Sequence, residues 1–168
     1  FHGTARHTVG TGLTLQLNSD DHDWNALGEA DFLLYSLTKS RFDIASRRDF
    51  YAAQKTAVRQ IGYRGEFFSR ATRNHRAPWL GEPCEQLFDT SEIFTPKDTP
   101  FDSQTIYDGF GLDEFLAPTR YYLPTKAEPL RSFPAAEFFH WYDPQGINQI
   151  RGQSSLSSVV NRLVDWYD

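Results

Sequence analysis

Proline is confined to one part of this chain. All nine prolines lie between Pro78 and Pro144, in a stretch that also carries fourteen of the aromatic residues. Proline fixes φ and lacks a backbone N–H, so long helices and central strands are disfavoured there. Disordered linkers contain few aromatic residues, so a free linker is disfavoured as well. The sequence therefore predicts that residues 77–153 form an extended, irregular segment, pinned by its rings onto a surface, which we expect a neighbouring protein to supply.

Hydrophobic periodicity predicts helices outside this stretch. One helix is expected from about Trp24 to Thr38, and another begins at Ser46, where Ser46 and Asp49 have the spacing of a capping box. Residues 66–74 are expected to continue as helix, and residues 155–167 to form a closing amphipathic helix. The apolar positions of the first helix fall three or four apart, on one face: Trp24, Leu27, Ala30, Leu34 and Leu37.

These patterns predict a mainly α fold in one domain, residues 1–168. Its expected parts are an N-terminal arm (1–19), a part with two or three helices (20–76), the extended wrapping segment (77–153) and a C-terminal helix (154–168). Residues 11–17 alternate apolar and polar, which favours one lone strand. The longest apolar runs are a few residues, far below the roughly 20 that a transmembrane helix needs, so no membrane span is predicted.

Charge is segregated along the chain. Residues 39–76 carry ten basic and three acidic side chains, a net charge of +7, whereas residues 1–38 carry −4 and residues 77–168 carry −8, which together give the total of −5. The basic stretch faces either the acidic segment of its own chain, which we favour, or an acidic protein or anionic lipid headgroups. Nucleic acid is not expected as a partner, because the whole chain is acidic, with a pI of about 5.5.

Three local clusters are candidates for a catalytic or metal site. The acids around His22, residues 20–23, have the chemistry of metal ligands, but helix capping explains them. The two glycines and three carboxylates of residues 108–114 are typical of a turn. Cys84 is the single cysteine, and the acids at positions 82 and 85 are expected to raise the pKa of its thiol rather than activate it. The sequence therefore predicts no catalytic, cofactor or metal site, and no enzyme.

One resemblance nevertheless implies an enzyme. Phe1-His2-Gly3-Thr4 resembles the first strand motif of ADP-ribosyltransferase folds, in which a His contacts the nicotinamide nucleotide. Leu33-Leu34-Tyr35-Ser36-Leu37-Thr38 resembles their second strand, which bears a Tyr. The resemblance implies, as an alternative, an ADP-ribosyltransferase-like enzyme that uses His2 and Tyr35.

Two further resemblances point to mitochondria. Phe1 to Thr8 resembles a mitochondrial processing site, and the first nineteen residues contain no acid, as in the end of a targeting segment. Leu34-Tyr35-Ser36, Arg59-Gln60-Ile61 and Glu66-Phe67-Phe68 resemble the helical LYR-motif subunits and assembly factors of mitochondria. Ser36 stands where that motif has Arg, so the acyl carrier protein binding of the family is not carried over.

The favoured hypothesis is a non-catalytic accessory subunit of a large mitochondrial inner-membrane complex, a respiratory complex or the ATP synthase, peripheral to the membrane. The expected partners are other protein subunits and anionic lipid headgroups, and no cofactor is expected. A free-standing adaptor is a further alternative. Interfaces are enriched in aromatic residues and Arg, and the residues predicted to bind partners are Arg47, Arg48, Lys55, Arg59, Trp79, Phe94, Phe101, Phe110, Tyr121, Tyr122 and Trp141.

Overall fold

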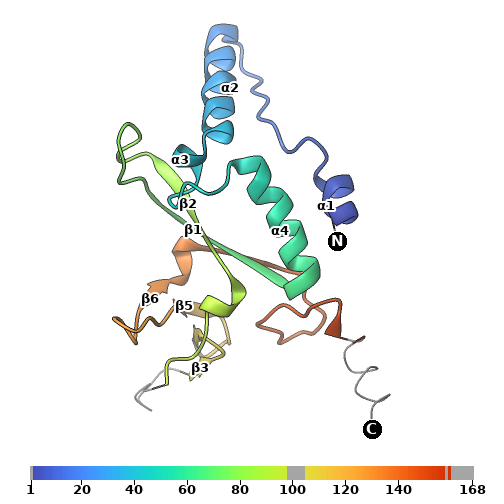
Figure 1. The fold of residues 1–168 in the computed structure, drawn as a ribbon, viewed down its shortest axis with the longest axis vertical. Coiled ribbons are helices and arrows are strands. Elements are labelled where there is room, and N and C mark those ends of the chain that lie inside the picture. The colour runs from blue at the N-terminus through green and yellow to red at the C-terminus, as the bar shows by residue number, and fades with distance from the viewer. Residues whose placement is uncertain (1, 98–104, 158, 160–168) are drawn as a thin grey trace. The chain divides into compact units, whose positions relative to one another are not determined.

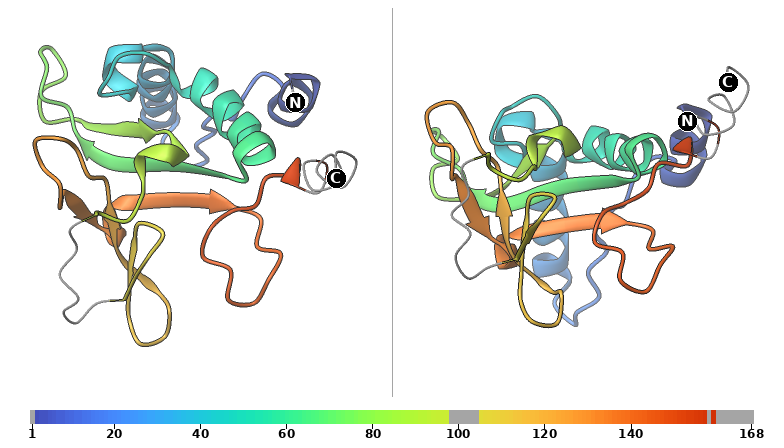
Figure 2. Two further views of the ribbon diagram at one scale, coloured as in Figure 1. Left: turned by 60° about the horizontal axis from the view of Figure 1, so that its bottom comes forward. Right: turned by 90° about the horizontal axis from the view of Figure 1, so that it is seen from below.

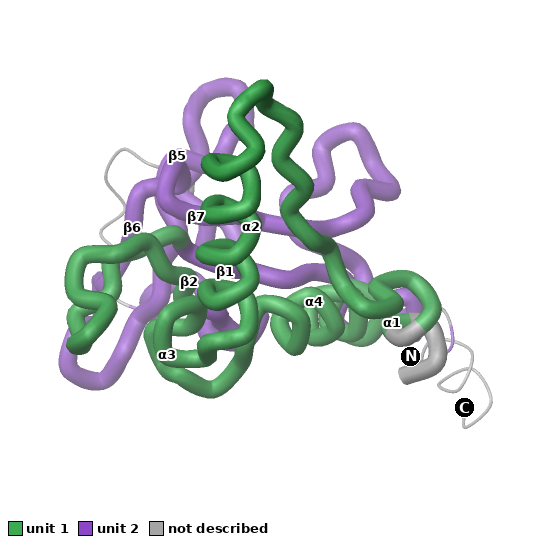
Figure 3. Tube along the Cα trace, turned by 90° about the horizontal axis from the view of Figure 1, so that it is seen from above, with its two compact units in different colours: residues 1–63, 71–86 green, residues 64–70, 87–168 purple. Residues whose placement is uncertain are grey.

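The structure is a computed structural model that describes residues 2–97, 105–157 and 159 (Figure 1). Helices and short antiparallel strands both contribute, so the fold is α/β and the prediction of a mainly α fold is wrong. The chain divides into two compact units, residues 1–63 with 71–86 and residues 64–70 with 87–168 (Figure 3). The prediction of a single domain stays a prediction.

The first unit is largely helical. Rings from three of its helices pack edge to face: the ring centroids of Phe32 and Phe50 are 5.6 Å apart, and those of Tyr35 and Phe42 are 5.7 Å apart. The elements of this unit are α1 (His2–Val9), α2 (His22–Leu37), α3 (Lys39–Phe42), α4 (Phe50–Arg64) up to residue 63, and the adjoining parts of β1 (Glu66–Arg73) and β2 (Pro83–Phe88).

The second unit is built from strands. The first part of β1 pairs antiparallel with β7, with Phe68 opposite His140, and the two strands lie side by side (Figure 2). A four-stranded antiparallel sheet has the order β3-β4-β5-β6. The remaining elements are η1 (Thr90–Glu92), β3 (Thr105–Tyr107), β4 (Phe110–Leu112), β5 (Pro118–Tyr122), β6 (Ser132–Pro134), η2 (Ala135–Glu137) and β7 (Phe138–Tyr142).

Aromatic rings fill the core of the second unit. Phe68 and Phe110 are fully buried, with their ring centroids 6.1 Å apart. Tyr121 stacks on Phe138 at 4.7 Å, and Phe138 in turn stacks on Phe88 at 5.5 Å. Rings that are far apart in sequence therefore cover one another, which gives these short strands a common hydrophobic core.

The prediction that residues 77–153 form an extended wrapping segment is therefore wrong. Its prolines lie where strands tolerate them, because Pro83 and Pro118 are the first residues of β2 and β5, and Pro134 is the last residue of β6. All three are exposed. A proline at a strand end removes no interior ladder hydrogen bond, so a proline-rich segment forms short strands.

Glycine 109 makes the tight turn between β3 and β4. Asp108 and Gly109 both have positive φ, 46° and 88°, as in the two-residue hairpins that fit the twist of paired strands. A Cβ at Gly109 would lie 2.7 Å from the backbone nitrogen of Phe94. The prediction that residues 108–114 contain a turn is confirmed.

Other sequence predictions had mixed outcomes. The helix predicted from Trp24 to Thr38 is confirmed as α2, and the helix predicted from Ser46 begins only at Phe50, as α4, whose Ala52 N–H donates to Asp49 at 2.7 Å. Residues 66–73 are a strand, so the helix predicted there is wrong, and residues 11–17 form no strand. Most of the closing helix, predicted for residues 155–167, lies outside the described residues. No helix in the described part of the chain has the length and apolarity to span a membrane.

Removal of a core ring should weaken the second unit. Phe110→Ala is expected to lower the free energy of unfolding by about 3–5 kcal/mol, because truncation leaves a cavity among buried rings. Urea denaturation of the whole chain measures this. The matched control is Phe115→Ala: Phe115 is 82% exposed, so the expected change is below about 0.5 kcal/mol. Equal effects of the two variants would contradict the position of Phe110 in the core.

Candidate subunit interface

Helix α2 carries an apolar face that its own unit leaves exposed. This face contains the predicted stripe, and its members are among the most exposed apolar side chains in the described residues. The exposed fractions are 57% for Trp24, 71% for Leu27, 50% for Leu33, 50% for Leu34 and 57% for Leu37. Leu27, Leu34 and Leu37 share one side of the helix, with Trp24 and Leu33 on its two flanks. Several large apolar side chains exposed together on one helix are more often part of an interaction site than of an ordinary surface.

The opposite side of α2 packs against its own unit, through the rings of Phe32 and Tyr35 as well as through polar side chains. The N–H of Leu17 donates to the carboxylate of Glu29 at 2.8 Å, and Ser19 donates through its hydroxyl to Asn25 at 2.7 Å. Ser36 on this face is fully buried. The segment before α2 therefore lies along the helix on its polar side, and the leucines are left on the other side.

The ends of α2 are fixed by local hydrogen bonds. Asp21 is the N-cap and accepts a hydrogen bond from the N–H of Trp24 at 2.9 Å, while Thr38 donates its N–H to the carbonyl of Leu34 at 3.1 Å. The capping role predicted for the acids of residues 20–23 is therefore confirmed for Asp21. In the described residues no three His, Cys, Asp or Glu side chains are placed to hold a metal ion.

A buried arginine holds α2 in place. Arg41, on α3, donates through Nη1 and Nη2 to the two carboxylate oxygens of Asp31 on α2, at 2.9 and 3.1 Å, and through Nε to Glu82 at 2.6 Å. Its guanidinium carbon lies 4.9 Å from the ring centroid of Trp79. A bidentate pair of this kind defines geometry as well as energy, so Arg41 ties α2 to α3 and to the turn before β2.

The surroundings of Arg41 contain further buried groups. Burial raises the pKa of Tyr35, on α2, to about 12, and the nearby Glu85 adds to that rise. Burial likewise raises the pKa of the Cys84 thiol, with Glu85 and Asp43 contributing. A thiol with a raised pKa is a poor nucleophile, which agrees with the expectation from the sequence.

Replacement of Arg41 by lysine should loosen α2. Lysine cannot form the bidentate contact with Asp31, so Arg41→Lys is expected to lower the free energy of unfolding by about 1–2 kcal/mol and to speed amide exchange in α2. Hydrogen exchange with mass spectrometry measures both effects. Arg47→Lys is the control, since Arg47 is exposed, and its exchange should match that of the wild type. Unchanged exchange in Arg41→Lys would show that the contact does not hold the helix.

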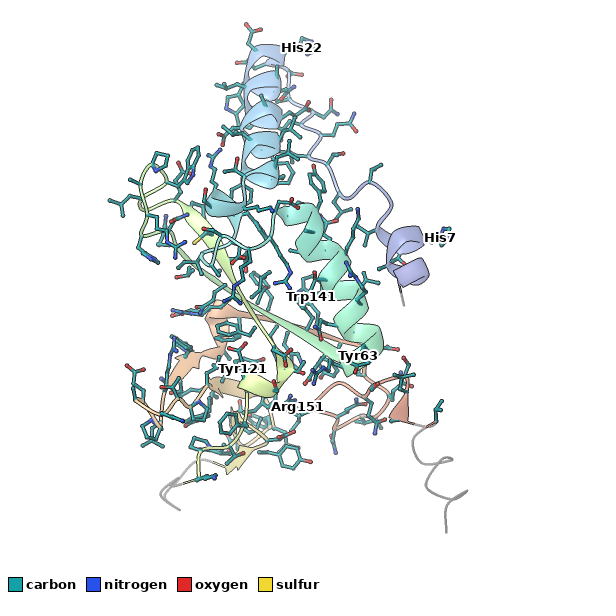
Figure 4. The ribbon with its side chains drawn as sticks, viewed as in Figure 1. His7, His22, Tyr63, Tyr121, Trp141 and Arg151 are labelled. Carbon is teal, nitrogen blue, oxygen red and sulfur yellow. The ribbon has the colours of Figure 1, made fainter. Side chains whose placement is uncertain are left out.

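A second charged network lies within the second unit. The carboxylate of Glu66, at the start of β1, accepts hydrogen bonds from Nε of Arg151 at 2.8 Å and from the N–H of Gly152 at 2.8 Å, and Nε2 of His140 lies 3.0 Å away. Arg151, which is labelled in Figure 4, lies in the segment after β7. It also donates to the carbonyl of Asp108 at 2.8 Å. The charged groups of this network are bound to one another and to backbone groups of the same unit, which indicates a structural role.

The hydrogen bonds decide the ionisation of Glu66. Burial opposes ionisation and by itself raises the pKa of this carboxyl, but the hydrogen bonds from His140, Arg151 and Gly152 outweigh it, so the pKa lies below its usual range. A carboxyl whose pKa is lower in the folded state stabilises the fold above its unfolded pKa and loses that contribution as the pH falls through the folded value.

Glu66→Gln should therefore have a pH-dependent effect. At pH 7 the variant is expected to be less stable than the wild type by about 2–4 kcal/mol, because Arg151 loses its buried counter-charge. The difference should shrink as the pH falls below about 4.3, the ordinary Glu value, because the unfolded chain is protonated there before the folded carboxylate, and it should be lost as the pH falls through the lower folded pKa. Urea denaturation between pH 7 and pH 3 gives both curves, and a difference that stays constant over this range would contradict the lowered pKa.

The residues predicted to bind partners lie in different environments. Arg47, Phe94 and Trp141 are exposed, Phe110 and Tyr121 are buried in the core of the second unit, and Phe101 lies outside the described residues. The others are half-buried: Arg48, Lys55, Arg59, Trp79 and Tyr122. As a partner-binding set they stay a prediction. The leucines of α2, which sequence reasoning identified only as a helix stripe, were not in that set.

Comparison with known families decides what the chain is related to. A family profile described as phage portal protein, lambda family, matches residues 3–168. The chain belongs to this family. No curated protein matches it significantly. Portal proteins assemble into multi-subunit oligomers, so the general prediction that the chain works with other protein subunits holds. The family match indicates a phage protein associated with the capsid or virion, and the predicted mitochondrial location is wrong.

The mitochondrial interpretation is thereby wrong. The portal family accounts for nearly the whole chain, whereas the LYR-like resemblance rested on three tripeptides, one of which, Glu66-Phe67-Phe68, lies on a strand. An accessory subunit of a respiratory complex or the ATP synthase, a mitochondrial location and contacts with anionic lipid therefore have no support. The two alternatives, an ADP-ribosyltransferase-like enzyme and an adaptor, have none either. The residues of the supposed enzyme strand motifs, His2 and Tyr35, lie on helices α1 and α2.

Proposed function

We propose that this portal-family chain is a non-catalytic structural part of an oligomeric phage portal. The family match over residues 3–168 carries the proposal. The exposed leucines of α2 support it, because a soluble monomer rarely leaves such a row uncovered. At roughly 25 cal/mol per Å² of apolar surface removed from water, covering this row favours association.

The charged networks of the described residues support a structural role. Arg41 is engaged by Asp31, Glu82 and the Trp79 ring, and Glu66 by Arg151, His140 and Gly152. Each network joins segments that are distant in sequence. Groups held in this way stabilise a fixed shape, which is what a building block of an assembly requires.

Capsid association tests the proposed function. Particles of a phage that encodes this chain, purified on density gradients, should contain the chain in several copies per particle, counted by quantitative mass spectrometry with labelled peptide standards. Particles from the same phage with the chain deleted are the control. Absence of the chain from purified particles would overturn the proposal.

A further inference from the structure

Strand β7 lies at the edge of its sheet. In the order β2-β1-β7 it pairs with β1 alone, and the two strands lie side by side in Figure 2. Alternate residues of a strand direct their backbone N–H and C=O groups to opposite sides, so β7 has such groups on the side away from β1. None of these groups forms a hydrogen bond with another described residue. A sheet edge of this kind binds an extended backbone, which presents matching donors and acceptors.

The side chains of β7 leave this edge accessible. Phe138 and His140 point into the core of the second unit, where His140 stacks on Phe68 with ring centroids 4.3 Å apart. Phe139 and Trp141 point to the other face and are 49% and 56% exposed. Proteins commonly protect an edge strand with lysine or proline, and β7 contains neither. Strand β7 therefore lacks the usual features that prevent a further strand from pairing.

The chain also contains a segment with a strand pattern and no strand partner. Residues 11–17 alternate apolar and polar, yet they form no strand, and Figure 1 shows them in the drawn-out connection between α1 and α2. Leu13 and Leu15 are 71% and 39% exposed. The alternation of this segment is therefore not used by the single copy of the chain.

One side of this segment is held by its own unit, and the other side is free. The N–H groups of Leu13 and Leu17 donate to side chains of α4 and α2, at 3.1 and 2.8 Å. In an extended segment the backbone groups of Thr14 and Gln16 point to the opposite side. They form no hydrogen bond with any described residue, and both residues are exposed. The segment can thus pair with a strand while it stays on its own helices.

We propose that residues 13–17 of one copy of this chain add as a strand to the free edge of β7 in a second copy. Main-chain hydrogen bonds provide the affinity of such a contact, and Leu13 and Leu15 provide apolar partners for the rings of Phe139 and Trp141. The inference rests on the proposed function, because it requires several copies in one assembly. Since the two surfaces differ, each copy gives its segment to one neighbour and its edge to the other. Such head-to-tail contacts generate rings when the rotation closes.

Two variants remove one half of the contact each. Thr14→Pro deletes an N–H on the free side of the segment, and Phe139→Lys with Trp141→Lys places charge on the exposed side of the edge. Each variant alone should self-associate at least about tenfold more weakly than the wild type, because proline and lysine both oppose edge pairing. Sedimentation velocity and native mass spectrometry measure the association, and circular dichroism checks that each variant is folded.

An equimolar mixture of the two variants is the sharper test. The Thr14→Pro chain keeps an intact β7 edge, and the lysine variant keeps an intact segment 13–17. The mixture should therefore form dimers with one copy of each variant, and these dimers cannot grow further because their remaining surfaces are the altered ones. Labelling one variant with ¹⁵N identifies the mixed dimers in native mass spectrometry.

Matched controls carry the same kinds of substitution elsewhere. Asn18→Pro places a proline at an exposed position directly after the segment. Phe115→Lys with Leu130→Lys replaces two exposed apolar side chains that lie in the same unit as β7 but off that strand. Both control variants should associate as the wild type does.

Three results would overturn the pairing: a mixture without mixed dimers, normal association of either variant, and a wild-type chain that stays monomeric at every concentration. Dimers of the Thr14→Pro chain alone would mean that two β7 edges pair with each other, which also overturns it. None of these results decides the proposed function, which capsid association tests separately. If the pairing fails and the chain is still present in the capsid, the copies meet through other surfaces and the portal role stands.

Discussion

The arrangement of the second unit depends on one buried carboxylate. Glu66 is 2% exposed, and an ionised carboxylate without partners costs several kcal/mol at such a position. Its partners come from β7, through His140, and from the segment at Arg151 and Gly152. Arg151 also donates hydrogen bonds to backbone carbonyls, including those of Ile93 and Asp108. Short strands and turns with little hydrogen bonding of their own are thus joined through a single charge.

The same carboxylate explains why the sequence misled us about residues 66–73. A half-buried strand is recognised in a sequence by alternating apolar and polar residues. The first four residues of β1, Glu66 to Ser69, are all buried, however, and burial alternates only in the rest of the strand. A glutamate in such a run favours a helix surface or a loop in any local reading. Its counter-charge, Arg151, lies 85 residues further along the chain. No window of a few turns contains both partners, so this element was not predictable from local pattern.

Elements that are determined by neighbouring residues in the sequence were predicted better. Helix α2 has its cap, its period and its end within one stretch of sequence, and its bounds lie within two residues of those expected. The proline-rich segment failed for the opposite reason. Its average composition disfavours regular structure, but the individual prolines occupy strand ends, and the rings Phe88, Tyr121 and Phe138 become a core only when three strands meet. Composition describes the segment as a whole, whereas the fold depends on single positions.

The direction in which α2 faces could not be read from its stripe at all. A row of leucines shows that an apolar surface will be covered, but the covering surface is decided by the rest of the chain. Here the segment before the helix already satisfies the polar face, with the Leu17 N–H on Glu29 and Ser19 on Asn25, and Arg41 holds Asp31 from the side. Because this side of α2 packs against its own unit, the leucines on the other side do not enter the core of that unit. This arrangement is consistent with a portal-family chain, because burial of the leucines, which are exposed in the single copy, can stabilise an assembly.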